Sequence, residues 1–300
     1  MIPERFFFFS LPYNGILWHM FRSISDKVFC FDVEWIPDPE TGRLLYGIED
    51  NPPFSCEESF RAMWKDAGAS PEKPHPYVKT VLCRIVSVAG VFRDASVKGQ
   101  PQLKLITLPA DPHDPKWTEK YILENFLRAV GGSHPQLVGY NSNNADIPII
   151  VQRSIVHGLD SFGFAERPEK PWMGVDYFAQ FGEGSIDLGA ILGKYGAMPR
   201  LDEIATLSGI PGKIDVHGDN VWNLWLQGRL ADIVNYNEFD ALTTFLLWAR
   251  MAHFAGLLDD DAYKAEQKAL RELVEEELAK GKEHMRRYLA RWDELTKNKG

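Results

Sequence analysis

The stretch VFCFDVEW, residues 28–35, decides the fold of this 300-residue chain. Its apolar start is typical of a buried β-strand, and side chains alternate between the two faces of a strand. Asp32 and Glu34, at the end of the strand, are therefore expected on the same face. Two carboxylates held together repel each other unless a cation lies between them, and Mg²⁺ prefers carboxylate oxygens. Taken alone, the pair also fits a strand that runs out into solvent.

Two downstream segments predict strands beside this one. Residues 80–92 (TVLCRIVSVAGVF) are β-branched and apolar, and residues 102–108 alternate in polarity. Because only residues 93–101 separate them, they are expected to be antiparallel neighbours. Together with the first strand they predict a three-stranded core sheet.

The following segments predict helices around that sheet. Apolar residues recur at helical spacing over residues 117–130, and Gly131-Gly132 is expected to end this helix. A short strand over residues 136–140 and a helix over residues 147–157 follow, with more helices after residue 187. This order favours an α/β fold, a mixed β-sheet with helices on its faces.

Changes in composition divide the chain into parts. Residues 1–26 are expected to form an N-terminal extension that packs on the domain, and residues 27–258 the domain itself. An insertion at 37–79, rich in Pro, Gly and acidic residues, is expected to be mainly a long connection, with room for a short helix over 60–65. The tail, residues 259–300, has a helical pattern whose apolar stripe suits packing on the domain, binding to a partner protein, or projection from the body.

Overall composition restricts the class of protein. The chain is 45% hydrophobic and 25% charged, and its net charge of -9 argues against a basic coat that binds nucleic acid nonspecifically. Such a charge still permits a cleft that holds a few phosphates. Cys30, Cys56 and Cys83 lack paired metal-ligand spacing, which predicts a reducing compartment, the cytoplasm, and no structural zinc. Apolar runs near the N-terminus are too short and broken for a membrane span, so no membrane role is expected.

A third acidic residue follows a predicted strand. Asp146 lies in GYNSNNADIP, residues 139–148, where a polar turn leads from the strand into a helix. Pro148 suits the first helical position, and the helix dipole favours a carboxylate at the helix entrance. Helix capping explains an aspartate here, and catalysis is the alternative.

A fourth acidic residue shares a helix face with a phenol. Tyr236 and Asp240 are four residues apart, so on a helix they lie on one face, and the apolar residues 245–248 bury the other side. A structural hydrogen bond between the two side chains is the alternative to a catalytic role.

Taken in order, these motifs resemble those of a known superfamily. Asp32-x-Glu34, then Asp146 after an Asn-bearing turn, then Tyr236-x-x-x-Asp240 resemble the three exonuclease motifs of the tyrosine subtype of the DEDD superfamily. The resemblance implies a ribonuclease H-like sheet and a 3′–5′ exonuclease.

Further stretches point to one branch of that superfamily. The GYN turn followed by DIP resembles the proofreading exonuclease domain of family B DNA polymerases. Residues 201–204 (LDEI) and 209–213 (GIPGK) resemble stand-alone predicted exonucleases related to that domain. Two positions depart from the pattern: Ala145 stands where Phe is usual, and Asn237 where Cys is frequent.

The resemblance implies roles for the motif residues. Two ions, Mg²⁺ or Mn²⁺, would serve hydrolysis of single-stranded ends, of DNA rather than RNA, with release of nucleoside 5′-monophosphates. Asp32 would bridge the ions, Glu34 and Asp240 would hold the ion beside the attacking water, and Asp146 the ion on the leaving-group side. Tyr236 would orient the water.

Three further residues are candidates for binding the substrate. Trp35 could stack on a base, Asn141 could hydrogen-bond the terminal nucleotide, and Lys213 could contact a phosphate. Trp35 is equally well explained as a core aromatic, and Lys213 as a solvated lysine. Asp187 resembles a recurring family position but also suits a helix cap.

Other functions stay open on the sequence alone. An exoribonuclease of the same fold would use the same carboxylates. A nuclease-like scaffold would bind nucleic acid without cutting it, and accidental motif matches would make the protein unrelated to nucleases.

Overall fold

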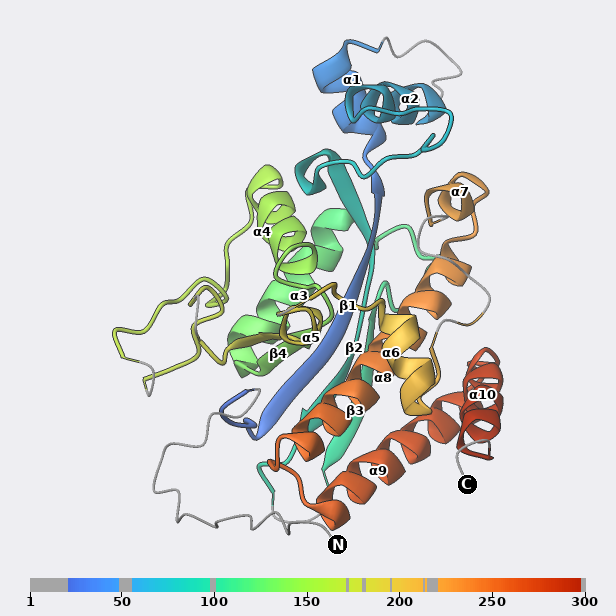
Figure 1. Ribbon diagram of the computed structural model, residues 1–300. Coiled ribbons are helices and arrows are strands. Elements are labelled where there is room, and N and C mark those ends of the chain that lie inside the picture. Colours follow the sequence, from blue (N-terminus) through green and yellow to red (C-terminus); the bar gives the residue numbers. More distant parts are fainter. Residues whose placement is uncertain are drawn as a thin grey trace, which may run out of the picture.

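The computed structural model describes residues 21–48, 56–97, 101–170, 173–179, 182–194, 196–212, 214 and 221–297. A five-stranded sheet forms its centre (Figure 1). In sheet order the strands are β3 (Gln102–Leu108), β2 (Cys83–Asp94), β1 (Lys27–Pro37), β4 (Gln136–Gly139) and β5 (Ser185–Asp187).

Strand directions make the sheet mixed. β1, β2 and β3 are antiparallel neighbours, whereas β4 is parallel to both β1 and β5. The predicted three-stranded core and the α/β, ribonuclease H-like mixed sheet are thereby confirmed. β5 has three residues, which is too short for a sequence pattern to reveal.

Helices cover both faces of the sheet (Figure 1). The described α-helices are α1 (Pro39–Tyr46), α2 (Cys56–Asp66), α3 (Glu119–Ser133), α4 (Asp146–Val156), α5 (Leu188–Leu192), α6 (Leu201–Ser208), α7 (Val221–Leu226), α8 (Leu230–Phe254), α9 (Asp260–Ala279) and α10 (Met285–Lys297). A short 3-10 helix, Thr80–Leu82, precedes β2. None of the described helices is long and apolar enough to cross a bilayer.

Side-chain alternation along β1 separates two hydrophobic cores. Val28 and Cys30 belong to the core under α8, whereas Phe29 and Phe31 belong to the core under α3 and α4. The period of two continues, so residues 32 and 34 face α8 together, as the sequence predicted. The pairing register between β1 and β2 shifts just after Glu34.

Helix α8 lies across the sheet and is buried along most of its length (Figure 1). It can be apolar nearly all round because the sheet lies on one side of it and α9 and α10 pack on the other. The catalytic candidates of α8 therefore sit on a helix that is fixed from several sides.

The C-terminal tail packs on α8. Leu270, Val274 and Met285 are buried in the core that α8 shares. Glu238 of α8, itself buried, accepts hydrogen bonds from the Lys282 ammonium at 2.7 Å and pairs with the His284 ring at 2.7 Å. Of the three alternatives for the apolar stripe, packing on the domain is confirmed, and nothing in the described part of the chain supports a partner protein on this stripe.

The insertion after β1 is more ordered than its composition indicates. It contains α1 and α2 rather than one short helix over 60–65. Asp38 caps α1 and accepts a hydrogen bond of 2.7 Å from Arg153 of α4, which also binds Glu119 of α3 at 2.6 Å. Buried charges need such partners, and this network fixes the insertion to the body of the fold.

Helix α3 continues past the two glycines that were expected to end it, and His134 in the left-handed region caps it instead. A Cβ at Gly131 would lie 2.0 Å from the Phe162 carbonyl oxygen. Glycine stands there because another segment packs against the helix backbone, and glycine inside a helix destabilises it by only about 1 kcal/mol.

Candidate active site

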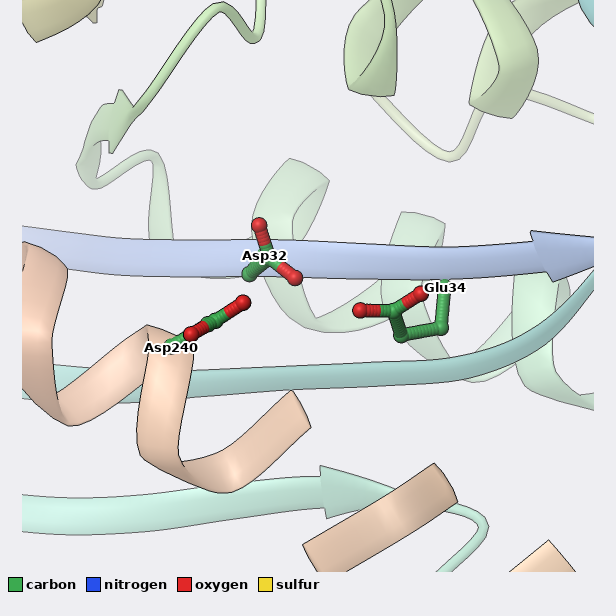
Figure 2. Close-up of side chains that lie close together, drawn as sticks. All are labelled: Asp32, Glu34 and Asp240. Carbon is green, nitrogen blue, oxygen red and sulfur yellow. The ribbon is translucent and has the colours of Figure 1, made fainter. Parts of the chain in front are cut away.

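Three carboxylates from distant parts of the chain converge. Asp32 and Glu34 come from β1 and Asp240 from α8, and one oxygen of each lies within 4.8 Å of the others. Figure 2 shows the three groups directed toward one another between the strand and the helix. The alternation of β1 and the position of α8 over it produce this meeting, so the strand does not simply run out into solvent.

Asp146 lies beside this group but outside it. It is the first residue of α4, only 3% exposed, and Ala145 occupies the N-cap position. Capping by Asp146 is therefore wrong as an explanation, and Pro148 is the third helical residue rather than the first. The charge of Asp146 is, after burial, the largest influence that raises the pKa of Asp32.

The carboxylates raise one another's pKa. Burial raises the pKa of Asp32, and the charges of Asp146, Asp240 and Glu34 raise it further. Burial and then the charge of Asp187 raise the pKa of Asp146. Asp32 and Asp146 are therefore harder to ionise without a compensating cation. A set of clustered carboxylate oxygens fits a hard divalent cation such as Mg²⁺ or Mn²⁺.

Tyr236 lies one helical turn before Asp240 and is 3% exposed. Burial, followed by the charges of Asp240, Glu34 and Asp32, raises the pKa of its phenol, and a hydrogen bond to Asp240 adds to the rise. The phenol stays protonated at neutral pH and acts as a hydrogen-bonding group at the edge of the cluster.

Asn237 is a site residue that the sequence reasoning missed. Its side-chain amide donates a hydrogen bond of 2.7 Å to Asp32, and the Ser87 hydroxyl donates one of 2.9 Å to the Asn237 carbonyl oxygen. The only signal in the sequence was the departure from the family pattern at this position.

Asp187 holds the turn between β4 and α4. Its carboxylate accepts from the backbone N–H groups of Asn141 at 2.8 Å and Asn143 at 3.0 Å, and it caps α5 by accepting from Ala190. The predicted cap is confirmed. Asn141 adopts a φ of 60°, which asparagine tolerates better than most residues, and its side-chain oxygen accepts from Asn144.

The remaining substrate-binding candidates have different outcomes. Trp35 is half-buried, packs against the α3 and α4 core, and also lines a surface cavity. The packing of Trp35 against the core is confirmed, and its stacking on a base stays a prediction. Lys213 lies outside the described residues.

Comparison with known protein families identifies a match over much of the chain. Residues 75–292 match a family described as "Predicted 3'-5' exonuclease related to the exonuclease domain of PolB". The matched region contains Asp146, Tyr236 and Asp240 and begins downstream of Asp32 and Glu34. No curated protein matches the sequence.

Among solved structures, the chain is similar to the family B DNA polymerase from the hyperthermophilic archaeon Pyrobaculum calidifontis. The TM-score is 0.40 and the sequence identity 16%, over 80% of this chain and 27% of the polymerase chain. The family match spans well over half of the residues. This chain belongs to the family of predicted 3′–5′ exonucleases related to the exonuclease domain of PolB.

Proposed function

We propose that the protein is a two-metal-dependent exonuclease that removes nucleotides from the 3′ ends of single-stranded DNA and releases nucleoside 5′-monophosphates. The observation that carries this proposal is the convergence of Asp32, Glu34 and Asp240 within 4.8 Å. Three carboxylates brought together across the fold repel one another, so their shared position is best explained by cations that bind between them.

Each residue has a distinct task in the proposed reaction. Asp32 would contribute to holding both ions, Glu34 and Asp240 would hold the ion that activates the attacking water, and Asp146 would help to hold the ion on the leaving-group side. When bound, the ions would lower the pKa of the attacking water and stabilise charge on the phosphate and the leaving 3′ oxygen.

The neighbours of these ligands position them. Asn237 fixes one oxygen of Asp32. Asp187 holds the turn that leads to Asp146. Tyr236 orients the attacking water by a hydrogen bond, a task that suits a protonated phenol. Asn141 contacts the terminal nucleotide at the turn after β4, and Lys213 contacts a phosphate.

A hydrolysis assay tests the proposal. Oligonucleotides labelled at the 5′ end should shorten stepwise from the 3′ end with Mg²⁺ or Mn²⁺, and not with a chelator. Glu34→Gln should abolish the shortening, whereas Glu166→Gln, an exposed site on the surface, should retain it. Shortening that survives both the chelator and Glu34→Gln would refute the proposal.

DNA and RNA oligomers of matched sequence in the same assay distinguish a DNA exonuclease from an exoribonuclease. Faster shortening of RNA would favour the exoribonuclease. Calorimetry with Mn²⁺ distinguishes the nuclease from a scaffold that binds nucleic acid without cutting it. A metal site at the carboxylates should bind Mn²⁺ in the wild-type chain and not in Glu34→Gln, and absence of binding to the wild-type chain would favour the scaffold.

A further inference from the structure

An aromatic groove runs along the insertion that follows β1. Two adjoining cavities, of about 510 and 540 Å³, form it and share the walls made by Trp64, Pro74, His75 and Trp222. One wall comes from α2 and the segment after it, and the other from α7. These helices lie toward the C-terminal end of β1, the strand that carries two of the carboxylates (Figure 1).

One end of the groove adjoins the C-terminal part of β1, where Trp35 and Pro37 line it. Trp35, the residue after Glu34, lines it together with Tyr77. Tyr77 is 60% exposed, so much of its side chain is available to a ligand. Burial, the Cys83 thiol and then the charge of Asp146 raise the pKa of Tyr77, as expected for a phenol close to that carboxylate.

The middle of the groove is a preformed cluster of rings. Trp64 contacts His75 and Trp222 with ring centroids 4.4 and 4.9 Å apart, and His75 contacts Trp222 at 4.7 Å. Trp64 is buried, His75 is exposed and Trp222 is half-buried. The buried ring of Trp64 thus supports the rings of His75 and Trp222. Because these rings are already held in place, little side-chain freedom is lost when a flat ligand stacks on them.

The charges along the groove favour a polyanion. Arg61, Lys65 and Lys73 line it against Glu57 and Glu72, an excess of positive charge in a chain whose net charge is -9. The Arg61–Glu57 pair is exposed on both sides, so Arg61 can exchange that partner for a phosphate at little expense in free energy.

Another cavity near the start of α4 serves as a contrast. It has a volume of about 440 Å³ and extends from Asn143 to Ser185. None of the described residues that line it is charged. The phosphates of a nucleic-acid strand that leaves the active site would therefore find cationic side chains in the aromatic groove and not among the described residues that line the cavity near the start of α4.

We propose that the aromatic groove binds the single-stranded nucleic acid that lies upstream of the scissile phosphate, with bases stacked on Tyr77 and Trp222 and phosphates near Lys65 and Lys73. The inference rests on the proposed function, because it assumes that a 3′ end occupies the carboxylate cluster. Stacking on aromatic rings accepts any base and so provides binding without sequence readout. The insertion between β1 and β2 then serves to hold the substrate.

Binding without metal tests the groove separately from hydrolysis. Oligothymidylates of about two and about ten nucleotides, labelled at the 5′ end, are titrated with the full chain in a chelator and followed by fluorescence anisotropy. The longer oligomer should bind more tightly. Trp222→Ala should weaken its binding about tenfold, by loss of one stacking contact, and weaken the shorter oligomer much less.

Further variants guard against a folding defect. Tyr77→Ala changes an exposed side chain and should produce the same length-dependent loss. Lys65→Glu should weaken binding and reduce its dependence on salt, whereas Lys268→Glu, exposed on α9, should not. Trp117→Ala, a half-buried tryptophan outside the groove that contacts Tyr121, is the matched aromatic control.

The outcomes distinguish the two proposals. Equal binding of short and long oligomers would contradict the proposal that the groove binds the upstream strand. Equal losses of affinity in Trp117→Ala and Trp222→Ala would also contradict it. Length-dependent binding with no shortening of any oligomer in Mn²⁺ would instead overturn the proposed hydrolysis.

Discussion

The side-chain amide of Asn237 donates a hydrogen bond of 2.7 Å to Asp32, across 205 residues of sequence. Ser87 fixes the orientation of that amide through a hydrogen bond of 2.9 Å to its carbonyl oxygen. This hydrogen bond holds the carboxylate of Asp32 in one orientation. The oxygen lone pairs that the hydrogen bond does not use therefore keep a fixed direction. Partners of this kind set the geometry and basicity of the groups that bind metal.

Loss of the Asn237 amide should therefore weaken the metal site. Asn237→Ala is expected to lower Mn²⁺ affinity or kcat by about 10- to 100-fold, measured by calorimetry and oligonucleotide shortening. Thr243→Ala is the matched control, because the buried hydroxyl of this α8 residue donates its hydrogen bond of 2.7 Å to the Pro211 carbonyl oxygen. An Asn237→Ala protein that binds Mn²⁺ as tightly as the control would contradict the positioning role.

Removing one carboxylate should reduce the rate of hydrolysis without lowering the thermal stability of the protein. Asp32→Asn and Asp240→Asn are expected to reduce hydrolysis by more than the roughly 100-fold effect of losing an outer partner. Without metal, their melting temperatures should equal or exceed that of the wild type, because repulsion among the carboxylates is relieved. Activity and melting curves are measured on the same preparations. A variant that unfolds well below the wild type would show that the carboxylate serves the fold.

Metal affinity should rise with pH. The pKa values of Asp32 and Asp146 are raised, so at lower pH these groups hold protons that an incoming cation must displace. Deprotonation on raising the pH removes that competition, and Mn²⁺ then binds more tightly. Calorimetry in two buffers of different ionisation enthalpy should reveal proton release on binding. An affinity that is flat between mildly acidic and mildly alkaline pH would argue against these raised pKa values.

The tail should contribute stability through Glu238. This buried carboxylate interacts with Lys282, His284 and the Thr107 hydroxyl. Glu238→Ala removes this partner from all three groups and leaves Lys282 paired with Glu277. We expect the free energy of unfolding to fall by about 3–5 kcal/mol, measured by urea denaturation. The exposed pair of Lys268 and Glu272 is the control. Glu272→Ala should change the free energy of unfolding by less than about 1 kcal/mol. Equal effects would mean that the tail is held by its apolar contacts alone.

Short-range periodicity explains what the sequence could predict. Alternation places residues 32 and 34 on one face, and a spacing of four places Tyr236 with Asp240, so both halves of the site could be anticipated separately. Their meeting depends on α8 packing on the face of β1 that also carries Val28 and Cys30. The ordered motifs supplied that link through the family resemblance.

Interactions across the sheet explain what could not be predicted. Asn237 is oriented by Ser87, which lies opposite Glu34 in the pairing of β1 with β2, and only the three-dimensional register reveals this contact. The tail was ambiguous because an apolar stripe does not specify what covers it. The insertion looked irregular because the ion pair that anchors it joins Asp38 to Arg153, which lies far away in the sequence.

A crystal of the wild-type protein soaked with Mn²⁺ and a nucleoside 5′-monophosphate tests the central claim most directly. Anomalous scattering should reveal two ions, about 3.5–4 Å apart, between Asp32, Glu34 and Asp240, with Asp146 beside the second. Anomalous maps without any ion among these carboxylates, from crystals in which the nucleotide is bound, would contradict the account.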